Sequence, residues 1–259
     1  MSTSPFYPQP PHLMVQVWTP RPPLEAFAAV ALAVQASGAE PTGAVETAPV
    51  GAGFAWLFDL DDAVRRRDVD VETFRQLVSG ADDGVRVVRA AFVRDGEPVV
   101  VEYGASPAGD PHPMLVATYA AGLDLPEEVR EEPDEAAARR TAGWSVALLS
   151  RMVADTGALY GTVTVEEPMP TPAQLASGAE LTGTVLVSLR LTDAVPDLVP
   201  AMAAALPGAQ ELRLPEGTLF AGVRPFRTDG RASVWADHAQ DTEVGRLVGT
   251  AVNDLLHPA

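Results

Sequence analysis

The sequence predicts an α+β protein in which helices pack on one face of a mixed, largely antiparallel sheet. Segments that alternate with period two are interspersed with segments whose apolar residues recur every three or four positions. Asp95-Gly96 lies between two strand-like segments and suits a tight hairpin turn. The stretch 133–172 has the pattern of a long amphipathic helix, a glycine stop, a strand and a proline-rich turn. Hairpins and helices in irregular alternation favour α+β over a doubly wound parallel sheet.

The first half of the chain contains most of the expected strands. In chain order we expect a flexible proline-rich tail (1–11), a strand (13–19), a buried helix (24–37), a loop (39–53), a short strand or helix (54–60), two surface helices (61–67 and 71–79), a hairpin (85–93 with 98–103), a loop (104–113) and a strand (114–121). Gly38 stops the first helix, and prolines close the first strand.

The second half is built around the long helix, which we expect to start after an N-cap at Asp134 and to end at Gly157. Its apolar stripe includes Trp144, the largest side chain expected in the core. In chain order there follow a strand (159–166), one helical turn (172–177), a strand (182–191), a helix (196–206), strands (212–214 and 218–226), a hairpin partner (231–236) and a closing helix (242–256).

Domain organisation is predicted as a tail at 1–11, an amino-terminal α+β lobe at 12–125 and a carboxy-terminal α+β lobe at 126–259. The acidic stretch 125–132 is the expected seam between them. A chain of 259 residues can equally bury its core as one large domain, so both arrangements stay open.

Composition excludes several chemistries. All 18 basic residues other than histidine are arginine, so a P-loop lysine, a Schiff base and a lysine general base are impossible. The absence of cysteine excludes disulfides, thiol nucleophiles and Cys-ligated metal sites. The acidic stretch 59–72 lacks the ligand order of an EF-hand, and Gly51-Ala-Gly53 lacks the third glycine of a dinucleotide motif. We therefore predict neither a cofactor nor a metal.

The net charge of −17 narrows the class of partner. It argues against nucleic acid and against an anionic membrane surface, because both need a basic face. A basic partner protein fits better, since opposite fields speed encounter. The alternative is that the charge serves solubility alone. The longest apolar run, 26–36, is about half of the ~20 residues that a spanning helix needs, so a cytoplasmic location is expected.

Two sets of residues are candidates for a site. The first comprises Asp/His neighbours that a hydrolase or a small-molecule site could use: Asp110, His112, Asp237 and His238. No G-x-S-x-G or H-x-x-x-H spacing accompanies them. The second set is acidic or aromatic and is expected to face a partner: Tyr160, Glu166, Glu167, Glu127, Glu128, Glu131 and Glu132. The alternative for the second set is an exposed strand end with solvated acids.

The helix with Trp144, followed by Tyr160-Gly-Thr-Val-Thr-Val-Glu-Glu-Pro-Met-Pro-Thr-Pro-Ala-Gln-Leu175, resembles a pattern in immunity proteins of bacterial polymorphic-toxin systems. In these proteins a Trp-bearing helix precedes a strand that ends in a Pro-x-Pro turn. The resemblance covers residues 134–226. It implies an α+β protein that binds and neutralises a cognate toxin without catalysis, and a basic toxin would match the acidic chain.

Three functions are therefore open. The first is a non-catalytic inhibitor or immunity protein that binds a basic partner. The second is an enzyme or small-molecule-binding protein that uses the Asp/His pairs, which requires His112 and His238 to meet in a cleft. The third is a component of an oligomeric assembly, with a large apolar self-interface. The sequence leaves the oligomeric state undetermined.

Overall fold

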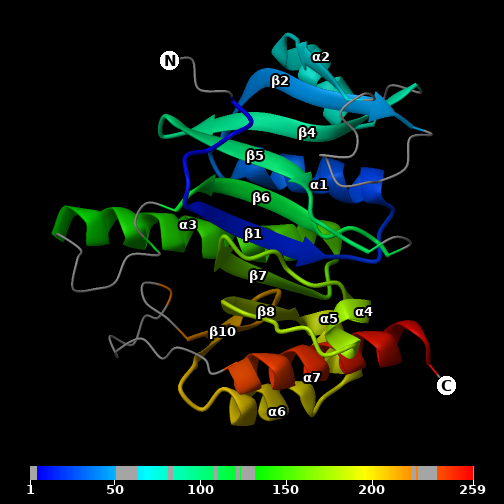
Figure 1. Cartoon of the computed structure of the whole chain (residues 1–259), viewed down its shortest axis with the longest axis vertical. Helices are drawn as coiled ribbons and strands as arrows, with labels where there is room; N and C mark the ends of the chain where they lie inside the picture. The colour runs from blue at the N-terminus through cyan, green and yellow to red at the C-terminus, as the bar shows by residue number, and fades with distance from the viewer. Residues whose placement is uncertain are drawn as a thin grey trace.

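The α+β prediction is confirmed by the computed structural model, which shows a ten-stranded antiparallel sheet with helices packed around it (Figure 1). The structure describes residues 5–50, 64–80, 84–107, 110–120, 123, 132–222, 226 and 238–258. The strands are β1 (His12–Trp18), β2 (Glu40–Pro49), β3 (Arg65–Asp68), β4 (Val85–Arg94), β5 (Glu97–Tyr103), β6 (Met114–Tyr119), β7 (Tyr160–Val165), β8 (Thr184–Ser188), β9 (Gln210–Leu214) and β10 (Gly217–Ala221). The helices are α1 (Pro23–Ala36), α2 (Val71–Val78), α3 (Glu132–Thr156), α4 (Pro172–Ala176), α5 (Leu189–Ala194), α6 (Leu198–Ala205) and α7 (His238–Leu256).

The strands follow the order β3-β2-β4-β5-β6-β1-β7-β8-β10-β9 across the sheet. The first strand of the chain is therefore an interior strand, which pairs with β6 on one side and with β7 on the other. Because β6 precedes residue 125 and β7 follows it, the two predicted lobes share one continuous sheet. The division into two folding units stays a prediction.

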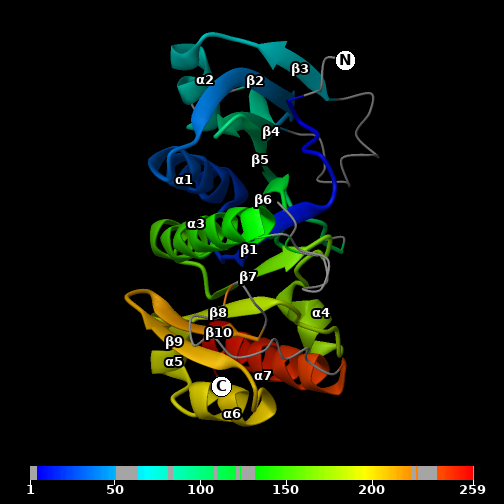
Figure 2. The ribbon, with the colours of Figure 1, turned by 90° about the vertical axis from the view of Figure 1, so that its left-hand side faces the viewer.

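The helices lie on both faces of the sheet rather than on one (Figure 2). Helices α1, α2 and α3 contribute to one apolar cluster together with Val15 and Val17 of β1. Helices α4 to α7 contribute to a second cluster with Trp18 and Tyr160, whose side chains alternate onto the opposite face. In the described part of the chain, strands β2 to β6 have helices on one face. Their other face, which continues onto β1 and the end of β7, is crossed by two extended segments.

Those two segments cross the helix-free face. The amino-terminal segment, residues 5–11, buries Phe6 against Ala44, Ala91 and Val100, so this part of the chain packs on the sheet. The flexible tail at 1–11 stays a prediction. The crossing segment, residues 167–171, runs back over β7 and β1 and leads to α4. Both segments bring polar groups to one end of the sheet.

Several sequence predictions are confirmed. Asp95 (φ 52°) and Gly96 (φ 85°) form the tight turn between β4 and β5, and Gly157 (φ 63°) ends α3 in a left-handed conformation. Trp144 is 9% exposed and donates its indole N–H to the Ser37 carbonyl at 3.2 Å. The side chains of β7 alternate as expected, with Val163 packed in the cluster on the α3 side.

Other predictions are wrong. The expected loop at 39–53 contains β2, the expected helix at 61–67 ends in β3, and the expected strand at 182–191 becomes α5 from Leu189. Helix α3 begins at Glu132, so Asp134 lies inside the helix and is not its N-cap. The segment 54–60, the hairpin partner 231–236, Trp56 and Trp235 lie outside the described residues.

These errors have physical causes. β2 begins with Glu-Pro-Thr-Gly, a turn-like sequence, and its pairing with β4 is irregular between Pro41 and Val45. The β3 segment Arg-Arg-Arg-Asp has no apolar alternation, because an edge strand with charged side chains needs none. Its strand conformation comes from pairing with β2, a tertiary contact that local sequence does not encode.

Within the described ranges, no helix combines the length and the apolar character that a membrane crossing requires.

Candidate functional site

One end of the sheet carries a row of carboxylates. Strand register places the start of β2 beside the end of β4, and the start of β1 beside the ends of β6 and β7. Five exposed acidic side chains occupy these strand ends and the adjoining turns: Glu40, Asp95, Glu97, Glu166 and Glu167. We call this set the acidic rim. It extends across six neighbouring strands, roughly 24 Å at about 4.8 Å per strand.

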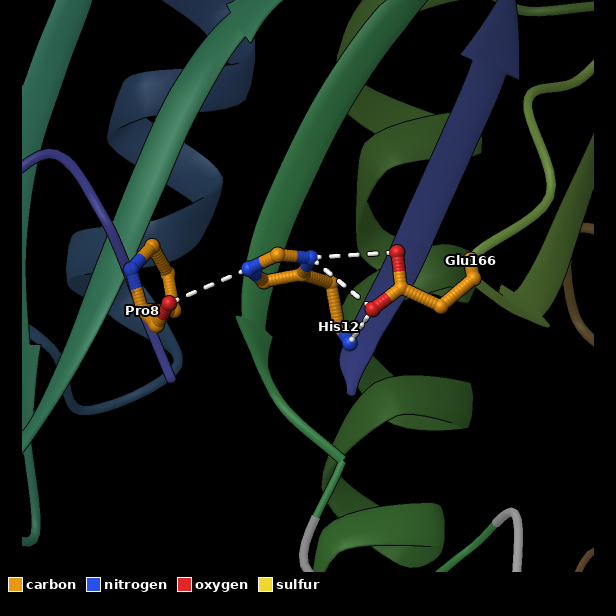
Figure 3. A network of polar contacts seen from close by, with 3 residues as sticks. All are labelled: Pro8, His12 and Glu166. Atoms are coloured by element: carbon orange, nitrogen blue, oxygen red, sulfur yellow. Dashed lines mark hydrogen bonds and ion pairs between the residues drawn. The ribbon is translucent and has the colours of Figure 1, made fainter. Parts of the chain in front are cut away.

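Glu166 is fixed by His12, the first residue of β1 (Figure 3). One carboxylate oxygen accepts the backbone N–H of His12 at 2.6 Å, and the other lies 3.1 Å from the imidazole Nδ1. The imidazole Nε2 lies 3.0 Å from the carbonyl oxygen of Pro8 in the amino-terminal segment. His12 therefore connects two strands with the amino-terminal segment.

Both neighbours of the His12 ring are acceptors. A carbonyl oxygen and a carboxylate can each receive a hydrogen bond, so both ring nitrogens donate together only when the imidazole carries two protons. In that form the contact with Glu166, 3.0 Å at its shortest, is an ion pair. The backbone contact from the His12 N–H to the carboxylate is present in either form of the ring.

Glu166 also has an unusual backbone conformation. Its φ is 59°, and the other non-glycine residue with positive φ in the described part of the chain is Asp95, also in the rim. The left-handed region costs a residue with a Cβ atom roughly 1–2 kcal/mol. The turn sequence explains Asp95, whereas at Glu166 the contacts with His12 hold the conformation, which directs the carboxylate across the strand end.

Glu167 leads into the crossing segment, which a buried glutamine fixes to the sheet. The Gln16 amide nitrogen donates to the Glu167 carbonyl at 2.9 Å, and the Gln16 carbonyl oxygen accepts the Met169 N–H at 2.9 Å. The Thr164 hydroxyl donates to the same Glu167 carbonyl at 2.6 Å. The Glu167 carboxylate stays exposed and accepts a hydrogen bond from Thr182 at 2.5 Å. Its position is therefore set at both the backbone and the side chain.

Tyr160 does not face a partner, so this prediction is wrong. Its side chain is fully buried, and its hydroxyl donates to the Pro170 carbonyl at 2.7 Å, beneath the crossing segment. Burial raises the pKa of the phenol well above its ordinary value, and the charge of Asp110 adds to this. The alternation that placed Tyr160 and Glu166 on one face is correct, but the proline-rich segment folds back over that face and covers the tyrosine.

A buried ion cluster lies on the same sheet face beneath the amino-terminal segment. Arg89 of β4 donates to Glu102 at 2.7 Å and to Glu46 at 3.2 Å, and its guanidinium lies 5.5 Å from the centre of the Tyr7 ring. Burial lowers the pKa of Arg89, but the two carboxylates outweigh it and the net pKa is raised. Burial also raises the pKa of Glu46, against the opposing charge of Arg89. Two carboxylates thus share one guanidinium.

Asp110 and His112 act as structural ties in the loop 104–113. The Asp110 carboxylate accepts a hydrogen bond from the Thr171 hydroxyl at 2.8 Å, which ties the loop to the start of α4. The His112 Nδ1 lies 2.9 Å from the Gly104 carbonyl oxygen, so this nitrogen carries the proton and donates. The ring packs edge-on against Tyr103 at 6.3 Å.

Of the predicted Asp/His set, the structure describes the side chains of Asp110 and His112. His238 is the first residue of α7, while its side chain and Asp237 lie outside the described residues. The segment after α4 runs antiparallel to α7, with Leu181 bonded to Asp241 and Ala176 beside Gly249. Thr171, and with it Asp110, therefore lies toward the far end of α7 from His238.

The other predicted acidic residues precede α3. Glu127, Glu128 and Glu131 lie outside the described residues, and Glu132 is the first residue of α3, with an undescribed side chain. The first turn of α3 lies at the same end of the molecule as the start of β1 (Figure 1). Within the described residues, no group of three or more metal-ligating side chains gathers at one point.

Sequence reasoning missed Glu40, Asp95, Glu97 and His12 as members or supports of this site. The Asp-Gly turn could have indicated Asp95 and Glu97, because a hairpin turn must lie at an end of the sheet. Glu40 and His12 carry no such signal. Their positions follow from the pairing of β2 with β4 and of β1 with β7, which joins residues far apart in the chain.

Comparisons with known proteins do not assign this chain to a family. No protein-family model matches the sequence, and no curated protein matches it. Among solved structures, the Pseudomonas aeruginosa T6SS protein PA0821 is similar over 95% of this chain and 85% of that one, with 11% identity and a TM-score of 0.40. At this identity and TM-score, the likeness carries no conclusion about this chain.

Proposed function

We propose that this chain is a non-catalytic binding protein of the immunity type, which engages a basic partner protein through the acidic rim. One observation carries the proposal: five exposed carboxylates lie at one end of a single sheet, three at β2 and the β4–β5 turn and two after β7. Like charges placed side by side repel one another, so the row costs the free protein stability. Opposite charges on a partner would relieve that repulsion.

The total charge supports the same partner class. A chain with a net charge of −17 attracts a basic protein over a long range and repels nucleic acid. Electrostatic steering of this kind raises association rates to about 10⁸–10⁹ M⁻¹s⁻¹ at low salt. Because the Debye length is about 8 Å at physiological ionic strength, association is expected to slow steeply as salt is added.

The rim is also preorganised. Glu166 is held by His12, Glu167 by Thr182, and Asp95 by the turn conformation and by Arg94 at 3.0 Å. Side chains that are ordered before binding lose less entropy on association, about 0.5–1.5 kcal/mol for each side chain that does not have to be immobilised. Three of the five rim acids are held in this way, which suits recognition of a partner surface better than a mobile acidic tail does.

The nature of the partner follows from the resemblance of residues 134–226 to immunity proteins. In that family the bound protein is a toxin, and binding silences it without any reaction. A basic toxin would present arginine or lysine side chains to the rim. The Asp/His alternative has less support, since Asp110 and His112 make structural hydrogen bonds and the first turn of α7 lies far from them.

The test is a capture experiment in the native host with two charge-matched variants. The rim variant carries Glu40→Gln, Glu97→Gln, Glu166→Gln and Glu167→Gln, which keep the acceptor oxygens. The control variant removes four exposed charges elsewhere, with Glu72→Gln, Asp193→Asn, Glu211→Gln and Asp254→Asn. Each variant loses four negative charges, so an effect of net charge alone would be the same in both.

We expect the wild type and the control to capture the same basic protein and the rim variant to lose it. Stopped-flow association with that protein should show a rate at least tenfold lower for the rim variant at low salt. Equal loss in both variants would assign binding to net charge, and equal retention would place the interface elsewhere. Co-expression then tests whether the captured protein is a toxin. The wild-type chain should restore growth of cells that express the captured protein, and the rim variant should not.

A further inference from the structure

The two edges of the sheet differ in sequence. An edge strand presents backbone N–H and C=O groups that can pair with another strand, and proteins often protect such edges with charged side chains. At one edge, three of the four residues of β3 are arginine. At the other edge, β9 has the sequence Gln-Glu-Leu-Arg-Leu, with one charge of each sign on either side of a leucine. In the part of the chain that the structure describes, β9 pairs with β10 alone.

The register of the β9–β10 hairpin determines which backbone groups of β9 point outward. The Glu216 carbonyl oxygen accepts the first backbone N–H of α5 at 2.8 Å, on the side of β8. Backbone groups alternate in direction along a strand, so the next residue, Gly217, directs its N–H and C=O toward its β9 partner Leu214. Every second residue of β9 counted back from Leu214 therefore bonds to β10. Glu211 and Arg213 lie between those positions and direct their N–H and C=O groups away from the sheet.

The side chains of this edge are accessible and are sorted by face. Glu211 and Arg213 are exposed and share one face of the sheet, where their charged groups lie 3.5 Å apart. The Arg213 side chain is 87% exposed, so it is available to a second carboxylate. Leu212 points to the opposite face, where it is half-buried against the apolar cluster that contains α1, α2 and α3. The edge is thus charged on one face and apolar on the other.

This edge is complementary to a second copy of itself. An antiparallel pair with its two-fold axis at Leu212 places Glu211 of each copy opposite Arg213 of the other. The outward backbone groups of these residues then face one another and exchange both N–H···O bonds. The two Leu212 side chains meet at the centre, at a non-hydrogen-bonded position where opposite side chains are closest. The same operation on β3 would place arginine against arginine, because Arg-Arg-Arg fills three of its four positions.

We propose that β9 is a self-association edge, through which two copies of the chain pair antiparallel and join their sheets into one continuous sheet. The charge pattern favours a second copy over a foreign strand, because it is complementary to its own reverse about Leu212. Five residues from each chain are far fewer than the roughly 20–30 that each partner contributes to a standard interface. The dimer is therefore weak, and its population depends on the concentration of the chain.

The experiment is sedimentation velocity of the full chain over a series of concentrations. It is made at physiological ionic strength, where a Debye length of about 8 Å screens the repulsion between two chains of net charge −17. We expect the wild type to shift from monomer to dimer as its concentration rises. Glu211→Arg and Arg213→Glu each place like charges opposite one another, so each should weaken dimerisation about tenfold or more.

Two restorations make the test specific to this pairing. The double variant Glu211→Arg with Arg213→Glu exchanges the two charges and keeps them complementary, so it should dimerise as the wild type does. An equimolar mixture of the two single variants should form a heterodimer, because one chain then presents two positive charges and the other two negative charges. Both substituted positions are exposed, so all variants should fold.

A cross-link locates the centre of the pair. The chain has no cysteine, so Leu212→Cys introduces a single thiol. Opposite Cα atoms at a non-hydrogen-bonded position are about 4.5 Å apart, within the range of about 4.4–6.8 Å for a disulfide. Mild oxidation should convert this variant to a covalent dimer. Glu72→Cys, at an exposed position of α2, should stay monomeric under the same conditions.

The proposal is overturned if the chain stays monomeric up to its solubility limit, or if neither single variant weakens the dimer. It is also overturned if neither restoration succeeds, which would fit pairing with a foreign strand, or if species larger than a dimer form, since a two-fold pair closes on itself. None of these outcomes bears on the acidic rim, which has no residue on β8, β9 or β10. The control variant of the capture experiment contains Glu211→Gln, which should weaken the dimer and leave capture by the rim unchanged.

Discussion

The two segments that cross the helix-free face of the sheet are attached by different chemistry. The amino-terminal segment lies over a charged cluster, in which Arg89 binds Glu46 and Glu102 and contacts Tyr7. The crossing segment is attached mainly by uncharged hydrogen bonds from Gln16, Thr164 and Tyr160, with one hydrogen bond from Thr171 to the Asp110 carboxylate. Burial raises the pKa of Glu46, so we expect the first attachment to respond to pH, whereas the hydrogen bonds from Gln16, Thr164 and Tyr160 should not. His12 joins the amino-terminal segment to Glu166, so this segment is also connected to the acidic rim.

The largest effect is expected from Arg89→Met. Removing the guanidinium leaves two carboxylates close together in a site where the three side chains are only 11–17% exposed. Loss of one partner in a buried ion cluster costs about 3–5 kcal/mol. Urea unfolding at pH 7 should show this loss, and the loss should shrink at pH 4, because burial raises the pKa of Glu46 and favours its neutral form there. Arg246→Met, which breaks an exposed pair with Glu243, serves as the control and should change little.

Gln16→Leu should rank second and should cost about 2–3 kcal/mol, because the Met169 N–H loses its acceptor and the Glu167 carbonyl loses one of its donors. The same loss is expected at pH 5 and at pH 8, since no member of this network titrates between them. Hydrogen exchange should accelerate at residue 169. Gln76→Leu, on the exposed side of α2, is the matched control. A loss that varied with pH would contradict the distinction between the two attachments.

Glu46→Gln and Glu102→Gln should have opposite effects on stability, although both remove a carboxylate from the charged cluster. The pKa of Glu46 is raised in the folded protein, so folding favours the protonated carboxyl. The stability that this preference contributes is fully present below the ordinary pKa of 4.5 and is lost as pH rises through the folded pKa. Glu46→Gln should therefore gain stability relative to the wild type between pH 4 and pH 7. Glu102→Gln removes the 2.7 Å ion pair and should cost about 1–3 kcal/mol at pH 7. Parallel pH profiles for the two variants would refute this division.

The smallest effect concerns two threonines of β7 on the same sheet face. The Thr164 hydroxyl donates to the crossing segment, whereas the Thr162 hydroxyl is buried and has no hydrogen-bond partner among the described residues. Thr164→Val should destabilise by about 1 kcal/mol, and Thr162→Val should be neutral or stabilise by up to about 1 kcal/mol. Thermal unfolding of the two variants measures the difference, and an equal loss in both would count against it.

The parts of the fold that sequence predicts are those defined locally. The hairpin at Asp95-Gly96 and the end of α3 at Gly157 follow from backbone preferences of single residues. β2 and β3 could not be predicted, because their strand conformation depends on pairing with partners distant in sequence. The same limit applies to the faces of the sheet, since nothing local indicates that α7 packs on the side opposite α3.

Only part of the candidate site could be predicted from the sequence, because exposure also depends on contacts that are distant in the chain. Glu166 and Glu167 stand out as paired acids at a strand end, and the structure leaves both exposed. Tyr160 shares the alternation of that strand, but whether a face is covered depends on the path of the segment after it. Gln16 determines that path from more than 150 positions away in the chain. A sequence pattern can assign a residue to a face, and only the assembled fold decides whether that face meets solvent.

The interior position of β1 has a consequence for how the molecule is made. This strand leaves the ribosome before its register partners on both sides, which are synthesised much later, and Leu13 pairs with both Thr118 and Val165. Until then its two edges are unpaired, and long-range pairing of this kind makes folding slow. A nascent chain halted before α3 would expose one of those edges, so aggregation during synthesis should depend on how quickly the second half emerges.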